Sequence, residues 1–220
     1  MMTPPSRSFL NWPLGLLFWV LSLTLGSVSH ANSDLFNLPA PSPSPQKLLQ
    51  AKAVINYVSD YQEDQQLFMD AQANIELSAE MAEALLHEIP LNFKTEIVLS
   101  EKSNFLGLAL FNSFKNIEYE TELRYFGYTQ TYILTNKRNK QNRTFKTLKE
   151  ALYTLSVLYN FPITELSRLH PSNAYQLKLR LSLMPDKLPA PLILKGYFSD
   201  AWQLDTQWHK IEIHSPLSWY

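Results

Sequence analysis

The chain of 220 residues contains no cysteine and only 5 glycines. The lack of cysteine excludes a disulfide framework, a thiolate zinc site, an iron–sulfur cluster and a cysteine nucleophile. The small number of glycines leaves little material for a glycine-rich phosphate-binding loop. A net charge of −1 at pH 7 gives no electrostatic indication of a nucleic-acid partner. These absences remove several classes of metalloprotein, redox enzyme and nucleotide-binding protein.

The first 31 residues have the pattern of an export signal. Arg7 supplies a positive charge, residues 14–25 form an apolar run, and residues 29–31 fit a small-x-small cleavage site. The run is short for a membrane-spanning helix, which needs about 20 residues. We therefore expect cleavage after export, with a retained anchor as the alternative if the apolar residues just upstream are included.

A proline-rich and serine-rich segment follows at residues 32–46. Its prolines stand at positions 39, 41, 43 and 45. Alternating prolines favour an extended, polyproline-like spacer that has no core to bury. The remaining chain, residues 47–220, is long enough for one β-rich domain.

Alternation of apolar and polar residues predicts half-buried strands from residue 47 onward. The clearest case is residues 175–183, in which Tyr175 and four leucines alternate with polar residues. Regular alternation is typical of antiparallel sheets that have one buried face and one solvent-exposed face. Further strands are predicted at residues 54–59, 66–77, 91–99 and 117–125.

Two segments have helical periodicity instead. Ser78 can cap a helix that runs to about Glu88, and Thr147 with Glu150 forms a capping box for a helix whose apolar stripe extends to Tyr159. Strands and helices do not alternate regularly. We therefore predict a mainly β fold, an antiparallel, immunoglobulin-like two-sheet sandwich of about seven strands with two connecting helices. The alternative is an α+β fold, with an open antiparallel sheet that carries both helices on one face.

The last part of the chain predicts an irregular strand. Trp202 and Trp208 share one phase of the strand period, whereas Ile211 has the other. A shift of one residue sends side chains to the opposite face, so we predict a bulge or bend between Trp208 and Ile211, with both tryptophans in the core. Pro189 and Pro191 predict a turn at the rim of the sheet.

Five spaced patterns follow one another between residues 54 and 213. They are EALLHEIPLNF (83–93), LRYFGYTQTYIL (123–134), FKTLKEALYTL (145–155), YQLKLRLSL (175–183) and the stretch 188–208. In this order they resemble an exported family of Gram-negative bacteria, known as domain of unknown function 4390. The resemblance implies a periplasmic or exported protein and no established activity or catalytic residues. The chain lacks the glycine usual near position 87 and the basic, tryptophan-rich cluster usual near 101–111.

Candidate catalytic and metal-binding residues are few. His209 and His214 are five residues apart, so a regular strand would send them to opposite faces. No serine lies in a Gly-x-Ser-x-Gly motif. Glu118, Glu120 and Glu122 share one strand face, which we interpret as a solvated face paired with lysines. We predict no catalytic residue, no metal site and no cofactor.

Six basic residues gather within 13 positions. We interpret this segment as a solvated loop between a strand and a helix. The alternative is a positive patch for phospholipid headgroups or an acidic partner. This candidate binding patch consists of Lys137, Arg138, Lys140, Arg143, Lys146 and Lys149.

The segment FLGLALF at residues 105–111 is apolar without clean alternation. We expect it to be buried as a core strand or turn. If it were exposed, it would form a lip that contacts a membrane or a ligand. The candidate apolar lip consists of Phe105, Leu106, Leu108 and Phe111.

The leading hypothesis for function is an exported, periplasmic domain that binds an envelope protein or the inner-membrane surface without catalysis. The alternative is a periplasmic carrier or sensor of an apolar ligand held between the sheets, suggested by an aromatic content of 13%. A third hypothesis is an enzyme whose residues converge only in space. A pocket between the sheets would favour the carrier over a module with a filled core.

Overall fold

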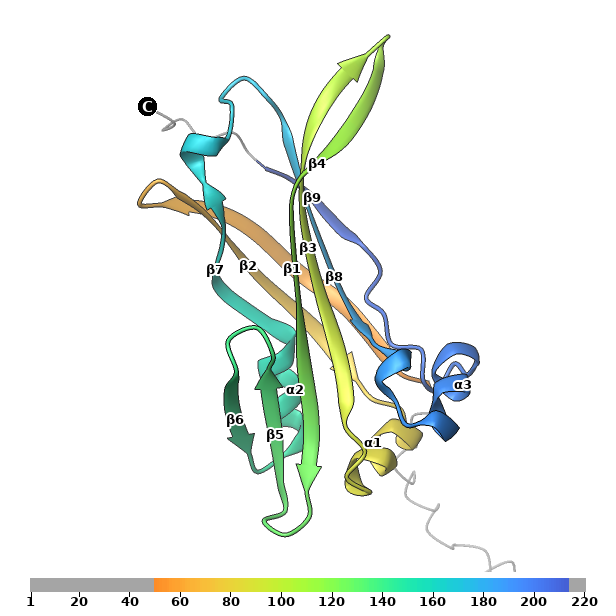
Figure 1. The fold of residues 1–220 in the computed structure, drawn as a ribbon. Coiled ribbons are helices and arrows are strands. Elements are labelled where there is room, and N and C mark those ends of the chain that lie inside the picture. The colour runs from red at the N-terminus through yellow and green to blue at the C-terminus, as the bar shows by residue number, and fades with distance from the viewer. Residues whose placement is uncertain (1–49, 214–220) are drawn as a thin grey trace, which may run out of the picture. The chain divides into compact units, whose positions relative to one another are not determined.

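The computed structural model describes residues 50–213, whose fold is shown in Figure 1. Two antiparallel sheets form it, one in the order β1-β2-β7 and the other in the order β6-β5-β4-β3-β8-β9. The mainly β, two-sheet sandwich predicted from the alternation is confirmed. The strands of the described region are β1 (Lys52–Glu63), β2 (Gln66–Glu76), β3 (Leu91–Phe105), β4 (Leu108–Phe126), β5 (Thr131–Asn136), β6 (Gln141–Phe145), β7 (Val157–Glu165), β8 (Tyr175–Leu183) and β9 (His209–Ile213).

The α-helices of this region lie at one end of the sandwich (Figure 1). Between the sheets, α2 contacts β2 on one side and β5 and β6 on the other. The helices are α1 (Ala79–Leu86), α2 (Leu148–Ser156) and α3 (Ala190–Phe198), and short 3₁₀ turns cover Leu166–Arg168 and Pro185–Lys187.

Both predicted helix starts are present. The Ser78 hydroxyl oxygen accepts a hydrogen bond of 3.1 Å from the Met81 backbone N–H. Thr147 and Glu150 form the reciprocal capping box, in which each side chain accepts a 3.3 Å bond from the other residue's backbone N–H. These bonds satisfy N–H groups that the first turn of a helix leaves without partners.

The end of α2 differs from the prediction. The helix stops at Ser156 instead of continuing to Tyr159, and Val157 has extended angles, φ −116° and ψ 130°. The chain continues directly into β7, which pairs with β2. Valine, tyrosine and phenylalanine favour a strand here, and the free edge of β2 supplies the hydrogen bonds. Tyr159 is 64% exposed and is not part of the helix's apolar stripe.

The predicted turn at Pro189 and Pro191 is the start of α3. Proline is tolerated in the first turn of a helix because the N–H it lacks has no intrahelical partner there. Gly196 lets α3 pack closely, since a Cβ at this position would lie 2.8 Å from the Pro185 Cβ. With β6, β7 and α3 added, the described region has nine strands and three α-helices, instead of about seven strands and two helices.

The hydrophobic core has two parts, both built from residues of the described region. One part lies where the helices meet the sheets and includes Met81, Phe93 and Trp202. The other lies between the sheets and includes Met69 and residues of β3 and β8. Residues 50–213 thus supply both sheets and both core clusters, as expected of a unit that folds on its own.

The two late tryptophans have different roles. Trp202 is 2% exposed, and its indole N–H donates a 3.0 Å hydrogen bond to the Glu80 carboxylate. Trp208 is 37% exposed and lies against the Arg180 guanidinium, so its prediction as a core residue is wrong. The predicted position of a bulge or bend, between Trp208 and Ile211, is also wrong, because β9 pairs regularly with β8 from His209 onward. The bend precedes Trp208, at Gln207, whose φ is +59°.

Candidate functional site

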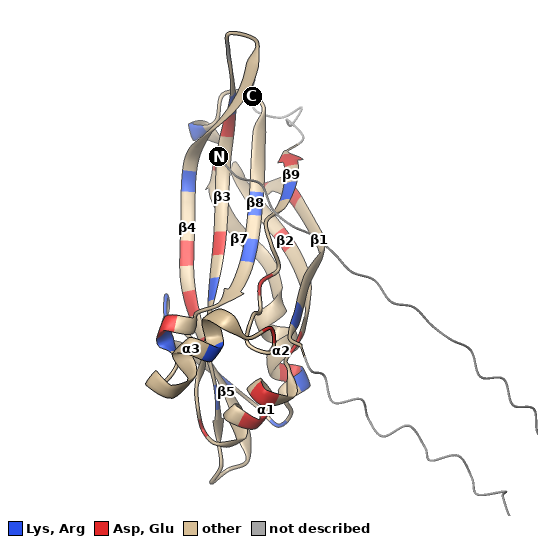
Figure 2. Ribbon diagram, turned by 90° about the vertical axis from the view of Figure 1, so that its right-hand side faces the viewer, with Lys and Arg blue, Asp and Glu red and all other residues tan. Residues whose placement is uncertain are grey.

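The β3–β4 hairpin extends beyond the strands that flank it. Pairing of β3 with β8 ends at Glu101, which lies opposite Tyr175, and β5 pairs only with the far end of β4. We call residues 103–114, the end of this hairpin, the finger. They include no charged residue, and the end of the hairpin carries neither blue nor red in Figure 2.

The finger turns at Leu106 and Gly107, whose φ values are +51° and +80°. Positive φ at both central residues defines a type I′ hairpin turn, which favours Asn-Gly or Gly-Gly. Glycine adopts this conformation freely, whereas leucine does so at a cost of about 1–2 kcal/mol. The tip therefore holds an apolar side chain at a position where local backbone energy favours asparagine.

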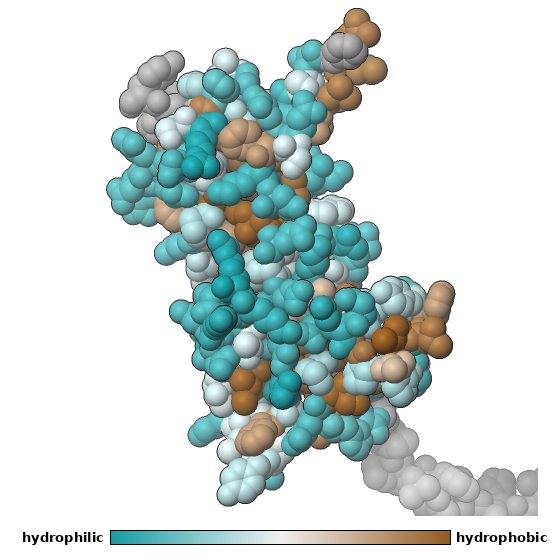
Figure 3. All heavy atoms as spheres, in the orientation of Figure 1, coloured by the Kyte–Doolittle hydropathy of each residue, from teal (hydrophilic) through white to brown (hydrophobic). Residues whose placement is uncertain are grey.

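The apolar side chains of the finger face solvent, which contradicts the expectation that residues 105–111 are buried. Exposed apolar side chains form the brown surface at the end of the hairpin in Figure 3. Among the described residues, neither β8 nor β5 extends along this part of the hairpin, and its apolar side chains stay exposed. The exposed fractions are 88% for Leu106, 68% for Leu108, 45% for Leu110, 38% for Phe111 and 38% for Phe114. Phe105 belongs to β3, but its side chain lies outside the described part of the chain.

Specific contacts fix the finger to the sandwich. The ring of Phe114 meets the ring of Tyr175 edge to face, with centroids 6.1 Å apart. The Tyr175 hydroxyl oxygen accepts a 2.9 Å hydrogen bond from the backbone N–H of His170, as in a tyrosine corner. Lys102 on β3 lies opposite Phe111 of the finger, and Lys115 on β4 follows the finger and lies opposite Leu99.

The six basic side chains of the candidate binding patch do not form one continuous surface. Lys137 forms ion pairs with Glu122 at 3.2 Å and Glu120 at 3.9 Å, and donates a 2.8 Å hydrogen bond to Asn92. Arg138 and Arg143 line a groove, described below. The exposed side chains of Lys140, Lys146 and Lys149 lie outside the groove lining.

The basic segment and the finger are not neighbours. The backbone N–H of Lys137 bonds to the carbonyl oxygen of Glu120 in the middle of β4. The 12 residues from there to Leu108 at the start of β4 span about 40 Å of extended strand. A single surface that combines the basic patch with the apolar lip is therefore not formed.

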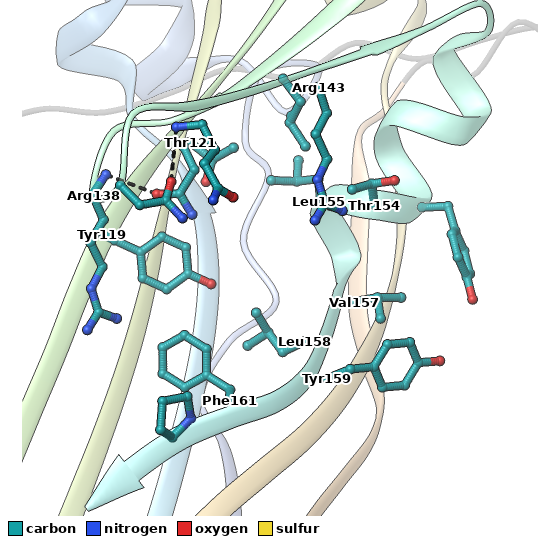
Figure 4. A pocket seen from close by; sticks show the side chains of 16 residues that line it. Tyr119, Thr121, Arg138, Arg143, Thr154, Leu155, Val157, Leu158, Tyr159 and Phe161 are labelled. Carbon is teal, nitrogen blue, oxygen red and sulfur yellow. Dashed lines mark hydrogen bonds between the residues drawn. The ribbon is translucent and has the colours of Figure 1, made fainter.

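A groove with a volume of about 640 Å³ lies between strands β4, β5 and β6 of the six-stranded sheet and the segment formed by α2 and β7. It is lined by residues of β4, β5, β6, α2 and β7, which include Tyr119, Leu155, Leu158 and Phe161. Figure 4 shows the labelled side chains from these elements around the central space. Its size falls within the usual range for small-molecule sites, about 300–1,000 Å³. The core between the sheets is therefore not closed on this side.

Aromatic rings form much of the groove floor. Tyr119 and Phe161 are stacked with centroids 5.9 Å apart, and the guanidinium carbon of Arg138 lies 5.7 Å from the centre of the Phe161 ring. Burial raises the pKa of the Tyr119 hydroxyl above its usual value, more than its hydrogen bond with Thr95 lowers it. Tyr119 therefore stays protonated at neutral pH and can act as a hydrogen-bond donor.

The strand glutamates are paired with lysines, as predicted. Lys94 lies 2.9 Å from Glu118 and 3.0 Å from Glu96, and its hydrogen bond to Glu118 lowers the pKa of that carboxyl. Acidic and basic residues stand near one another on β3, β4 and β8 in Figure 2. Within residues 50–213, no group of three or more histidine or carboxylate side chains is arranged to hold a metal ion. His214 lies outside the described residues.

A second exposed apolar surface lies on α3. Leu194 is 68% exposed and Phe198 80% exposed, and Figure 3 shows apolar side chains there, far from the finger. In the described part of the chain, no helix has both the length and the apolar composition needed to cross a membrane.

Sequence reasoning missed the groove and the α3 surface. The groove combines side chains from several separate segments, and its main sequence signal was the pair of arginines within the basic cluster. The α3 surface was missed because Pro189 and Pro191 were interpreted as a turn and not as the start of a helix.

Comparison with known proteins gives one family. The family model described as domain of unknown function (DUF4390) matches residues 50–212. No curated protein and no solved structure matches the chain. The matched range includes the finger, the groove and α3.

Proposed function

The chain belongs to the DUF4390 family, and from this premise we propose that it is an exported, non-catalytic binding domain of the bacterial envelope that attaches to a membrane surface through the finger. The observation that carries the proposal is the uncharged hairpin end with Leu106, Leu108 and Leu110 exposed. Export is supported by the N-terminal pattern of a charge, an apolar run and a small-residue site. The periplasm is the compartment that this pattern favours.

The energetics of the finger suit weak, reversible attachment. Full burial of a leucine side chain in an apolar medium contributes roughly 2 kcal/mol. Three exposed leucines therefore supply several kcal/mol, less than a membrane-spanning helix and close to the reversible binding of a single lipid chain. Lys102, which lies opposite Phe111 and about 10 Å along β3 from the turn, suits the anionic headgroups that a shallowly inserted tip would meet.

A lipid surface fits the finger better than a protein groove does. The finger has no charged side chain and its tip has no hydrogen-bonding side chain, so it lacks the electrostatic complementarity that gives a protein interface its specificity. The leucine at the strained turn position also favours this view. An apolar side chain there is locally costly, and its removal from water on a membrane would offset the cost.

Vesicle flotation tests the proposal with matched leucines. The chain from Asn32 onward, with and without Leu108→Ser, is floated with vesicles of phosphatidylethanolamine and phosphatidylglycerol. Leu194→Ser on α3 is the control, because Leu108 and Leu194 are both 68% exposed. We expect Leu108→Ser to weaken vesicle binding by about 10-fold and Leu194→Ser to leave it unchanged. Equal losses for the two variants, or no vesicle binding by the unmodified chain, would contradict the proposal.

A further inference from the structure

The groove carries an uncompensated positive charge. Its lining includes Arg138 and Arg143 and no aspartate or glutamate. Within the described residues neither guanidinium forms an ion pair, whereas the adjacent Lys137 is paired with Glu120 and Glu122. A cationic site of this kind favours an anionic group, and arginine binds carboxylate and phosphate with two parallel hydrogen bonds.

The strand register directs polar side chains into the same space. Arg143 lies opposite Leu134, and Gln141 lies opposite Asn136, in the antiparallel pair of β5 and β6. Residues opposite one another point to the same face of a sheet. All four residues line the groove. Arg143 and the buried Leu134 therefore lie side by side on the sheet face that forms one wall of the groove.

The opposite wall of the groove is mainly apolar. It is formed by Leu155 of α2 and by Val157, Leu158, Phe161 and Pro162 of β7, together with the hydroxyl-bearing side chains of Tyr153, Thr154 and Tyr159. The labelled side chains of Leu158 and Phe161 point into the space below Arg143 in Figure 4. A ligand that fills this groove therefore has a charged end and an apolar body.

The edge of β7 argues against a peptide strand as the occupant. Strand addition needs a regular row of free backbone N–H and C=O groups. The pairing of β7 with β2 has two register shifts, Asn160 has a φ of +50°, and Pro162 has no N–H to donate. An acyl chain needs no backbone partner and follows an irregular wall.

We infer that this groove binds an amphipathic anion, an acyl chain that ends in a carboxylate or a phosphate. The anionic head lies at Arg143, whose side chain points into the groove in Figure 4, and the chain packs on Leu158 and Phe161. The site is separate from the finger, and the inference does not depend on membrane attachment.

Calorimetric titration of the chain from Asn32 onward tests the inference with four probes of equal chain length. Decanoate and decyl phosphate carry the two candidate heads, decanol is neutral, and decyltrimethylammonium is cationic. We expect saturable binding of at least one anion with a Kd below about 100 µM, and binding of decanol at least about 10-fold weaker. The tighter of the two anions identifies the head group. No saturable binding of either anion, or equal affinity for decanol or the cation, would overturn the inference.

Neighbouring basic residues give matched variants. Arg143→Gln is expected to weaken binding of the anion by about 10-fold, while Lys146→Gln, in the same segment but outside the groove, leaves it unchanged. Thermal unfolding of each variant confirms that the fold is retained. A loss for Lys146→Gln as large as that for Arg143→Gln would overturn the inference. Leu108→Ser leaves anion binding unchanged, so failure of the groove and failure of the finger are distinguishable.

Discussion

The ring of Phe114 packs edge to face on the ring of Tyr175, with centroids 6.1 Å apart, where the finger leaves the sandwich. Tyr175 is 3% exposed and accepts a hydrogen bond from the backbone of His170. The finger is thus an extension of the main sheet whose base is attached to the core. A firmly held base allows an exposed tip to keep one orientation toward a surface.

Removal of the Phe114 ring is expected to loosen the finger. Phe114→Ala loses an aromatic pair that contributes about 0.5–1.5 kcal/mol, together with the apolar contact at the hairpin base. We expect faster amide hydrogen exchange at the finger and a drop of about 1–2 kcal/mol in the free energy of unfolding. The control is Phe111→Ala, because Phe111 is equally exposed at 38% and has no ring partner among the described residues. A similar increase in exchange for both variants would contradict the role of the ring contact.

Leu106→Asn is expected to change stability and binding in opposite directions. It creates the Asn-Gly pair that type I′ turns favour, at a position where leucine has a φ of +51°. Relief of this strain raises the free energy of unfolding by about 0.5–1 kcal/mol. Loss of the apolar tip lowers vesicle binding by about 10-fold. Chemical denaturation and vesicle flotation measure the two effects, and unchanged flotation would contradict a role for the tip.

The two late tryptophans are expected to differ in their contribution to stability. Trp202→Phe removes a buried indole that donates a hydrogen bond to Glu80, and should lower the free energy of unfolding by about 2–3 kcal/mol. Trp208→Phe acts on a ring that is 37% exposed and should lower it by less than about 1 kcal/mol. Urea denaturation of the two variants gives the comparison. Equal losses would mean that Trp208 is a core residue after all.

Stability at high pH is expected to depend on Tyr119. Burial raises the pKa of its hydroxyl in the folded state, so the unfolded chain releases this proton at a lower pH, about 10. Above pH 10 the unfolded state is therefore favoured, until the pH passes the folded-state pKa. Within this window the chain should lose up to about 1.4 kcal/mol per pH unit relative to Tyr119→Phe. Tyr128→Phe, on a ring that is 91% exposed, should behave like the unmodified chain in denaturation series from pH 8 to about 11.

Local sequence patterns correctly predicted the strands and helices that have one buried face and one solvent-exposed face. The alternation from Tyr175 to Leu183 became β8 with alternating burial at each position, because sheet packing follows the same period of two. The helix caps at Ser78 and Thr147 could be predicted because each depends on residues within one helical turn. The strand glutamates are paired with lysines as predicted, although the partners are not directly opposite: Lys94 lies opposite Glu120 and binds Glu118.

Features that depend on contacts between distant segments could not be predicted from the sequence. An apolar run such as residues 105–111 has the same sequence pattern in a core strand and in an exposed hairpin. Its exposure depends on β8, which begins at Tyr175 and so pairs with β3 only as far as Glu101. The boundary between α2 and β7 depends on the free edge of β2. The groove requires Arg138 and Arg143 to face Leu158 and Phe161, an arrangement set by the packing of α2 between the sheets.

The lack of cysteine allows the central claim to be tested with single labels. Leu106→Cys, at the tip of the finger, and Tyr128→Cys, in the turn at the other end of β4, are each labelled with an environment-sensitive fluorophore. Both side chains are about 90% exposed, at 88% and 91%. On addition of phosphatidylethanolamine and phosphatidylglycerol vesicles, the label at 106 should become brighter and shift to shorter wavelength, while the label at 128 stays unchanged. An unchanged label at 106, or equal changes at both positions, would contradict membrane attachment through the finger.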